Sequence, residues 1–188
     1  MFAALEDYHG GGDAAAIEPF KEHPETWEWA LASFIGAGVG TCYRGSRLFD
    51  TPEIERMVAK WASFWVRHRR ILTEDILHVR RPTVSGYDCL CHVSSVLQHP
   101  DDAEAMLCMV YNPTATIVQD SLRVSAYYTG MQEGDAVMVT EADDATTERV
   151  VNLGRGPALT FGVDLKAKHI TWFTVRKHAE TLKANALL

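Results

Sequence analysis

The sequence lacks any long hydrophobic run, and basic residues are in the minority. No segment approaches the roughly 18 consecutive apolar residues that a membrane-spanning helix needs. The formal net charge is −7 and the isoelectric point is near 5.6, so neither nucleic acid nor an anionic membrane surface would attract the chain. Basic residues cluster only at 67–70 and 80–81. We therefore expect neither a nucleic-acid partner nor a membrane partner.

The first 16 residues lack the features of a secretory signal. They have no basic start and no apolar centre. The chain as written therefore carries no export signal, and its localisation stays open.

The four cysteines lack the spacing of a metal site. Cys89 and Cys91 are separated by one residue, whereas structural zinc sites usually separate two cysteines by two to four residues. On a strand, both thiols would share one face and His92 would lie on the other. We predict small buried core cysteines and no metal. A disulfide from Cys89 or Cys91 to Cys108 remains an alternative if the strands are neighbours.

The glycine-rich segment Gly36–Gly40 is not typical of a nucleotide site. It follows a predicted helix and precedes an apolar segment, which reverses the strand, glycine loop and helix order that binds phosphate. We expect the glycines to end a helix, and we expect no cofactor.

Two helices are predicted in the first part of the chain. The range Glu53–Arg70 places apolar residues at three- and four-residue spacing, namely Ile54, Met57, Val58, Trp61, Phe64, Trp65 and His68. Asp50 or Thr51 can cap this helix, and Pro52 suits its first turn. An earlier helix is predicted from Pro24 to about Phe34, with one apolar face formed by Trp27, Ala30, Leu31 and Phe34.

A short strand, Val39–Tyr43, and a loop, Arg44–Phe49, are predicted between the two helices. The order helix, strand, loop and helix matches part of an α/β repeat.

After Pro82 the spacing of apolar residues changes from the three to four positions of a helix to the two positions of a strand. Alternation at Tyr87, Cys89, Cys91 and Val93 predicts a half-buried strand, and the apolar run Met106–Tyr111 predicts a strand buried on both faces. Further strands are predicted at Thr116–Val124, Ala136–Thr140, Glu148–Leu153, Pro157–Leu165 and His169–Val175. Six to eight short strands with turns between them indicate an antiparallel sandwich, followed by a frayed tail from Lys177.

Several segments together resemble a known family. They are Ile17–His23, Trp27–Leu31, Gly36–Val39, Cys42–Gly45 and Phe49–Pro52. This set resembles the end of the catalytic barrel in large bacterial glycoside-hydrolase-like proteins related to the α-galactosidase group. The ranges Trp65–Leu72 and Asp75–Pro82 resemble the last barrel helix and its exit into a C-terminal β-sandwich. Two later segments, Met109–Thr114 and Tyr127–Met131, resemble turns of that sandwich.

The resemblance implies an α+β fold in which terminal α/β units of a (β/α)8 barrel precede an antiparallel β-sandwich. Residues 1–72 would be the end of the barrel, 73–176 the sandwich and 177–188 a tail. Because a complete barrel needs about 200 to 250 residues, only part of one fits here. The two catalytic carboxylates would lie upstream, so we assign no catalytic residue within this chain.

The loop after the expected strand holds the only predicted substrate-binding residues. The resemblance places this loop at the C-terminal face of the barrel, where such barrels keep their active sites. Tyr43, Arg44 and Arg47 could then contact a sugar or its acidic group. In the alternative interpretation, Arg44 and Arg47 only tie the loop to Asp50 or to neighbouring helices.

Two functions remain open at the level of the sequence. The chain could be the C-terminal part of a glycoside-hydrolase-like protein whose partner is a carbohydrate, or a noncatalytic sandwich that binds carbohydrate or protein. One open face that carries the sandwich aromatics would favour binding; these are Tyr87, Tyr127, Tyr128 and Trp172. A large apolar surface on the helices would favour a truncated barrel that self-associates; its residues would be Trp27, Phe34, Trp61 and Trp65.

Overall fold

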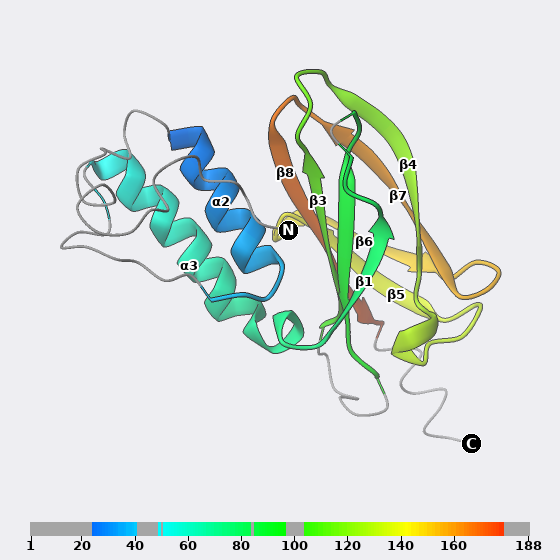
Figure 1. Cartoon of the computed structure of the whole chain (residues 1–188). Coiled ribbons are helices and arrows are strands. Elements are labelled where there is room, and N and C mark those ends of the chain that lie inside the picture. Colours follow the sequence, from blue (N-terminus) through cyan, green and yellow to red (C-terminus); the bar gives the residue numbers. More distant parts are fainter. Residues whose placement is uncertain (1–23, 41–48, 50, 84, 97–103, 179–188) are drawn as a thin grey trace. The chain divides into compact units, whose positions relative to one another are not determined.

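The computed structural model describes residues 24–40, 49, 51–83, 85–96 and 104–178. The chain divides into two compact units, Met1–Leu72 and Thr73–Leu188. Among the described residues, the first unit contains the helices α2 and α3, and the second contains the strands (Figure 1). Among the described residues, no helix is both long enough and apolar enough to cross a bilayer.

The longer helix, α3 (Pro52–Leu72), confirms the predicted helix and extends it by one residue before and two after. Thr51 caps it, because its Oγ1 accepts a hydrogen bond from the Ile54 amide at 3.3 Å. Pro52 occupies the first turn, where its missing N–H costs nothing. The buried residues follow the predicted stripe and continue it, at Ile54, Trp61, Phe64, His68, Ile71 and Leu72.

The earlier helix, α2 (Pro24–Gly36), ends in a glycine cap as predicted. Gly38 has φ 74°, its amide donates to the Ile35 carbonyl at 2.9 Å, and the Val39 amide donates to the Phe34 carbonyl at 2.9 Å. This pair of bonds is a Schellman motif. Val39 and Gly40 form no strand, and the rest of the predicted strand, residues 41–43, lies outside the described residues.

Glu28 connects the two helices of this unit. Its Oε1 accepts hydrogen bonds from Lys60 Nζ at 2.6 Å and from the buried Trp61 Nε1 at 3.2 Å. A buried indole N–H needs such an acceptor, so Glu28 both pairs a charge and satisfies a core residue. The predicted apolar face of α2 is only partly correct, since Trp27 and Phe34 are half-buried. The fully buried residues spread around the helix at Ala30, Leu31, Ala32, Ser33, Ile35 and Gly36.

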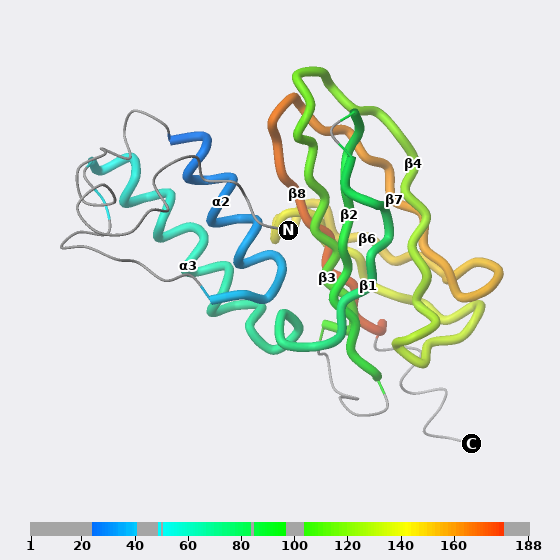
Figure 2. Tube along the Cα trace, viewed as in Figure 1, coloured from blue at the N-terminus to red at the C-terminus, as the bar shows by residue number. Residues whose placement is uncertain are grey.

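The second unit is an antiparallel β-sandwich, as predicted. One sheet has six strands in the order β1-β2-β3-β8-β5-β6, and the other pairs β4 with β7 (Figure 2). The strands are β1 (Asp75–Arg80), β2 (Asp88–Val93), β3 (Glu104–Asn112), β4 (Val118–Ser125), β5 (Ala136–Glu141), β6 (Asp144–Asn152), β7 (Ala158–Leu165) and β8 (His169–Lys177).

Strand β1 was not predicted as a strand. Leu77 and Val79 turn toward the core while His78 and Arg80 alternate with them, so the period of two is present but short. At the other end of the chain, β8 includes Lys177, which was expected to begin a frayed tail. Residues 179–188 of that tail lie outside the described residues.

The core lies between the two sheets. Alternate residues of β2, β3, β5 and β8 meet alternate residues of β4 and β7 in one cluster. Phe161 of β7 stacks on Phe173 of β8, with ring centroids 4.5 Å apart and planes at 12°. Strand β3 is buried on both faces from Ala105 to Asn112, as its continuous apolar run predicted.

The buried Asn112 connects the β3–β4 and β7–β8 turns, where the chain crosses between the sheets. Its Nδ2 donates to the carbonyls of Thr116 and Lys166, both at 2.8 Å. Its Oδ1 accepts from the amide and the hydroxyl of Thr114, at 3.1 and 2.7 Å. Lys168 reinforces the same place, because its Nζ donates to the Pro113 carbonyl. One amide side chain therefore joins two of the four connections between the sheets, β3–β4 and β7–β8.

We predict that Asn112→Ala lowers the free energy of unfolding by about 2 to 4 kcal/mol, because buried carbonyls and amides lose their partners. Urea denaturation of the full chain measures the change. Asn152→Ala is the matched control, since Asn152 is an exposed asparagine at the end of β6. A loss below about 0.5 kcal/mol for Asn112→Ala, the range of ordinary surface substitutions, would contradict the role assigned to Asn112.

Candidate functional site

The predicted sugar contacts Tyr43, Arg44 and Arg47 lie outside the described residues. Their role therefore stays a prediction. The candidate sites that the structure describes all belong to the strand unit.

The four sandwich aromatics do not share one open face. Tyr87 and Trp172 are buried, with exposed fractions of 3% and 8%. Tyr127 and Tyr128 are open, with exposed fractions of 68% and 62%. The aromatic candidates for binding are therefore reduced to one adjacent pair.

The three cysteines that the structure describes are small core residues, as predicted, and Cys42 lies outside the described residues. Cys89, Cys91 and Cys108 are buried free thiols. Cys91 lies directly opposite Cys108 in the β2–β3 register. Burial raises the pKa of the Cys89 and Cys108 thiols, so both stay protonated and unreactive. Among the described residues, no group of His, Cys, Asp and Glu is arranged to hold a metal ion.

Tyr127 and Tyr128 lie on the short 3-10 turn η3 (Tyr127–Thr129), between β4 and β5. Their ring centroids are 5.3 Å apart and their planes are at 89°, an edge-to-face pair. Thr129 Oγ1 donates to the Ala126 carbonyl at 2.6 Å, and the Tyr127 amide donates to Ser125 Oγ at 3.2 Å. The turn that carries the two rings is thus held by its own side chains.

Backbone bonds hold this turn to neighbouring loops. The Ala126 amide donates to the Pro157 carbonyl at 2.8 Å, and the Val96 amide donates to the Thr129 carbonyl at 2.8 Å. Farther along, the Gly156 amide donates to Glu133 Oε2 at 3.3 Å. Gly156 has φ 69°, a conformation that favours glycine. The β4–β5 and β6–β7 loops therefore form one connected end of the sandwich.

This end of the sandwich also presents exposed polar side chains. They are Ser125, Gln132, Glu133 and Arg155. The two tyrosine rings are thus an apolar surface on a connected loop layer that also offers hydrogen-bonding groups. We call Tyr127 and Tyr128 together the tyrosine pair.

A second polar cluster joins the two sheets at a different place. Asp120 of β4 accepts hydrogen bonds on Oδ2 from Arg80 at 3.0 Å and from the Tyr87 hydroxyl at 2.9 Å. The Arg80 guanidinium carbon lies 3.9 Å from the centroid of the Tyr87 ring. The Ser121 amide and the Tyr87 hydroxyl lower the pKa of the Asp120 carboxyl. The polar groups of Arg80, Tyr87 and Asp120 bond to one another, so this cluster stabilises the fold.

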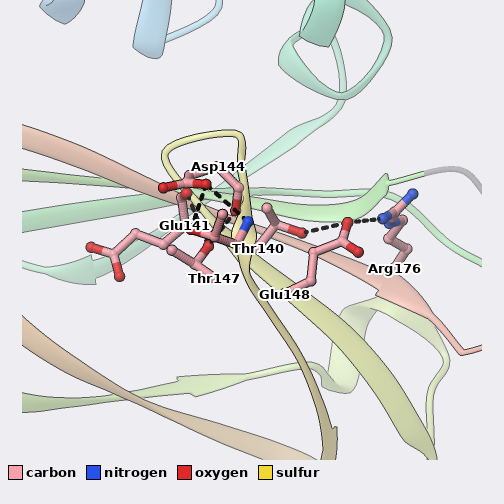
Figure 3. A network of polar contacts seen from close by, with 7 residues as sticks. Thr140, Glu141, Asp144, Thr147, Glu148 and Arg176 are labelled. Carbon is pink, nitrogen blue, oxygen red and sulfur yellow. Dashed lines mark hydrogen bonds and ion pairs between the residues drawn. The ribbon is translucent and has the colours of Figure 1, made fainter.

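A third polar network organises the β5–β6 hairpin (Figure 3). Thr147 Oγ1 accepts from the Glu141 amide and donates to the Asp144 carbonyl, at 2.8 and 2.7 Å. Glu148 pairs with Arg176 of β8 at 2.6 Å. Hydrogen bonds from Thr146 lower the pKa of the Asp144 carboxyl. These carboxylates serve the hairpin and its link to β8.

The sequence indicated Tyr127 and Tyr128 only as two of four sandwich aromatics, and it did not indicate the polar residues around them. Gln132, Glu133 and Arg155 are ordinary surface residues in the sequence. The turn signals at Gly130, Gly134 and Gly154–Gly156 placed them in loops. Only the sheet topology shows that the two loops share one end of the sandwich.

We predict that Asp120→Asn makes unfolding less sensitive to acid. Because the pKa of Asp120 is lowered in the folded state, its stabilisation is present above the ordinary value of 3.8 and is lost as pH falls through the lowered value. Melting temperatures of wild type and Asp120→Asn should therefore differ at pH 6, and the difference should shrink as pH falls below 3.8. Asp164→Asn, an exposed carboxylate change on β7, is the control. A constant difference across this range would contradict the prediction.

Comparison with known proteins gives only distant structural neighbours. No protein-family model matches the chain, and no curated protein matches it. One similar structure is a protein from Bacillus halodurans that carries the name α-N-acetylgalactosaminidase, with 9% identity and a TM-score of 0.49 over 82% of this chain. Another is a GH27 β-L-arabinopyranosidase from Geobacillus stearothermophilus, with 12% identity and a TM-score of 0.49 over 82% of this chain. The match covers 32% and 30% of those two proteins, so this chain spans about a third of their length.

Proposed function

We propose that this chain is the C-terminal part of a glycoside-hydrolase-like, carbohydrate-active protein and that it does not itself contain the catalytic carboxylates. The family resemblance in the sequence, which runs from about Ile17 to Val175, supports the first half of the proposal. The statement that this chain does not contain the catalytic carboxylates depends on which secondary-structure elements the helical unit contains.

The observation that carries the proposal is that the described part of the helical unit contains two helices and no strand. Barrel enzymes place their catalytic residues at the C-terminal ends of barrel strands. Glycoside hydrolysis needs two carboxylates across the scissile bond. In the strand unit, acidic side chains such as Asp120, Glu141 and Glu148 are used in contacts within the sandwich. The described residues thus offer no barrel strand from which such a pair could project.

The loop residues Tyr43, Arg44 and Arg47 complete the proposal. In a protein that supplies the missing barrel strands, they would contact the sugar at the C-terminal face of the barrel. Their role rests on the sequence resemblance.

A second candidate function is a noncatalytic sandwich that binds carbohydrate. The exposed tyrosine pair favours it, since this pair is the aromatic surface of the described sandwich that remains open. The two candidates are compatible, because a C-terminal sandwich of a sugar-processing protein can hold the polymer that another part cleaves.

We predict that the purified chain does not hydrolyse 4-nitrophenyl glycosides. A panel of α- and β-galactosides, α-N-acetylgalactosaminide and β-L-arabinopyranoside should release nitrophenol at the rate of buffer alone, because the proposal places the two catalytic carboxylates outside this chain. Release above this background that co-purifies with the chain and falls in an Asp88→Asn variant would contradict the proposal. Asp88 is the test residue because burial raises the pKa of its carboxyl, as in many general acids.

We predict self-association through the helical unit. Helices that belong to a barrel but lack its other elements leave apolar side chains open to solvent. Val66 of α3 is 65% exposed, and Trp27, Phe34 and Trp65 are half-buried. Light scattering after size-exclusion chromatography should give a mass above the 21.0 kDa of one chain, and the mass should fall on dilution. A single species of 21.0 kDa at every concentration would contradict self-association of the chain.

A further inference from the structure

We infer that the tyrosine pair, Tyr127 and Tyr128, is a binding platform for the pyranose rings of a neutral glycan. The inference rests on the proposed function, because it assigns the carbohydrate of that proposal to one place on the sandwich. Exposure, rigidity and the chemistry of the surrounding groups all favour this platform.

The packing of the sandwich core does not account for the exposure of the tyrosine pair. Core aromatics of the sandwich, such as Phe161 and Phe173, are at most 1% exposed. In the described residues of the strand unit, Tyr127 and Tyr128 are the large aromatic side chains that stay open. A ring that contributes little to the core and lies open beside a second ring is typical of a contact surface.

The turn that carries the pair is held in place, which lowers the entropy cost of binding. Thr129, which anchors the turn through its hydroxyl, is fully buried. The turn ends at Gly130 with φ 79°, and the Gly130 amide donates to the Tyr127 carbonyl at 3.2 Å. A tyrosine side chain has only two side-chain torsions to fix. The backbone of the turn is therefore fixed before any ligand arrives, and the two rings lie edge to face on it.

The surrounding chemistry fits a sugar. A pyranose ring has a face of C–H groups, which packs on an aromatic ring, and a rim of hydroxyls, which need donors and acceptors. The tyrosine hydroxyls and the exposed side chains of Gln132, Glu133 and Arg155 can serve that rim. Acidic and basic groups are both present, so the loop layer suits a neutral ligand more than a charged one.

Other ligand classes fit less well. A protein partner of standard size buries about 800 Å² on each side, which two tyrosine side chains cannot supply. Single-stranded nucleic acid also stacks on aromatic rings, but it needs a basic groove, and the chain carries a net charge of −7. The platform therefore suits a few sugar units of a neutral polysaccharide.

The test measures binding of the full chain to soluble polysaccharides by affinity electrophoresis. The probes are galactomannan, arabinogalactan and xyloglucan, and the variants are Tyr127→Ala, Tyr128→Ala and the double substitution. Ile117→Ala is the control, since Ile117 is 65% exposed in the β3–β4 turn of the same unit. Melting curves establish that each variant is folded.

We expect wild type and Ile117→Ala to be retarded equally by at least one probe. Each tyrosine substitution should weaken binding roughly 2- to 10-fold, the range for one aromatic contact, and the double substitution should abolish it.

Three results would overturn the platform. If wild type is retarded by none of the probes, both the platform and the carbohydrate-binding role of the sandwich are wrong. If wild type is retarded and the folded double variant binds equally well, only the platform fails and the proposed function stands. If the tyrosine variants change the mass measured by light scattering instead of glycan binding, the pair is a contact between copies of the chain.

Discussion

The sandwich depends on one buried amide. Asn112 holds two of the four connections between the sheets, β3–β4 and β7–β8, with hydrogen bonds to residues 114, 116 and 166. Strands β4 and β7 form a sheet of only two strands, which is at best marginally stable by itself. It persists because its apolar face is closed over the large sheet. The Asn112 bonds place these two connections so that this closure occurs in one register.

The polar contacts of the sandwich act as links between its parts. Asp120 ties β4 to Arg80 at the edge of the large sheet, and Glu148 ties β6 to Arg176 of β8 (Figure 3). Such surface pairs contribute modestly to stability, so their value lies in orientation. Both carboxylates, Asp120 and Glu148, are engaged in these contacts. Exposed aromatic and polar side chains lie on the loop layer around η3.

Much of the fold could be predicted from the sequence. The helix α3 follows from its apolar stripe and its cap at Thr51, and seven of the eight strands follow from alternation and turn residues. Strand β1 was missed because its period of two spans only Leu77 to Arg80 at an edge. The candidate site was harder to predict from the sequence than the fold. The sequence offered four sandwich aromatics, and it could not separate the buried Tyr87 and Trp172 from the exposed pair.

The sequence by itself determined the helices α2 and α3, seven of the eight described strands and the burial of Cys89, Cys91 and Cys108, because these depend on local periodicity and on side-chain chemistry. The tertiary structure decided the strand order, the meeting of two distant turns at Asn112 and the exposure of Tyr127 and Tyr128. The reason is physical. Pairing of β3 with β8 joins residues more than 50 positions apart, and no local pattern encodes which distant strand will cover a given face.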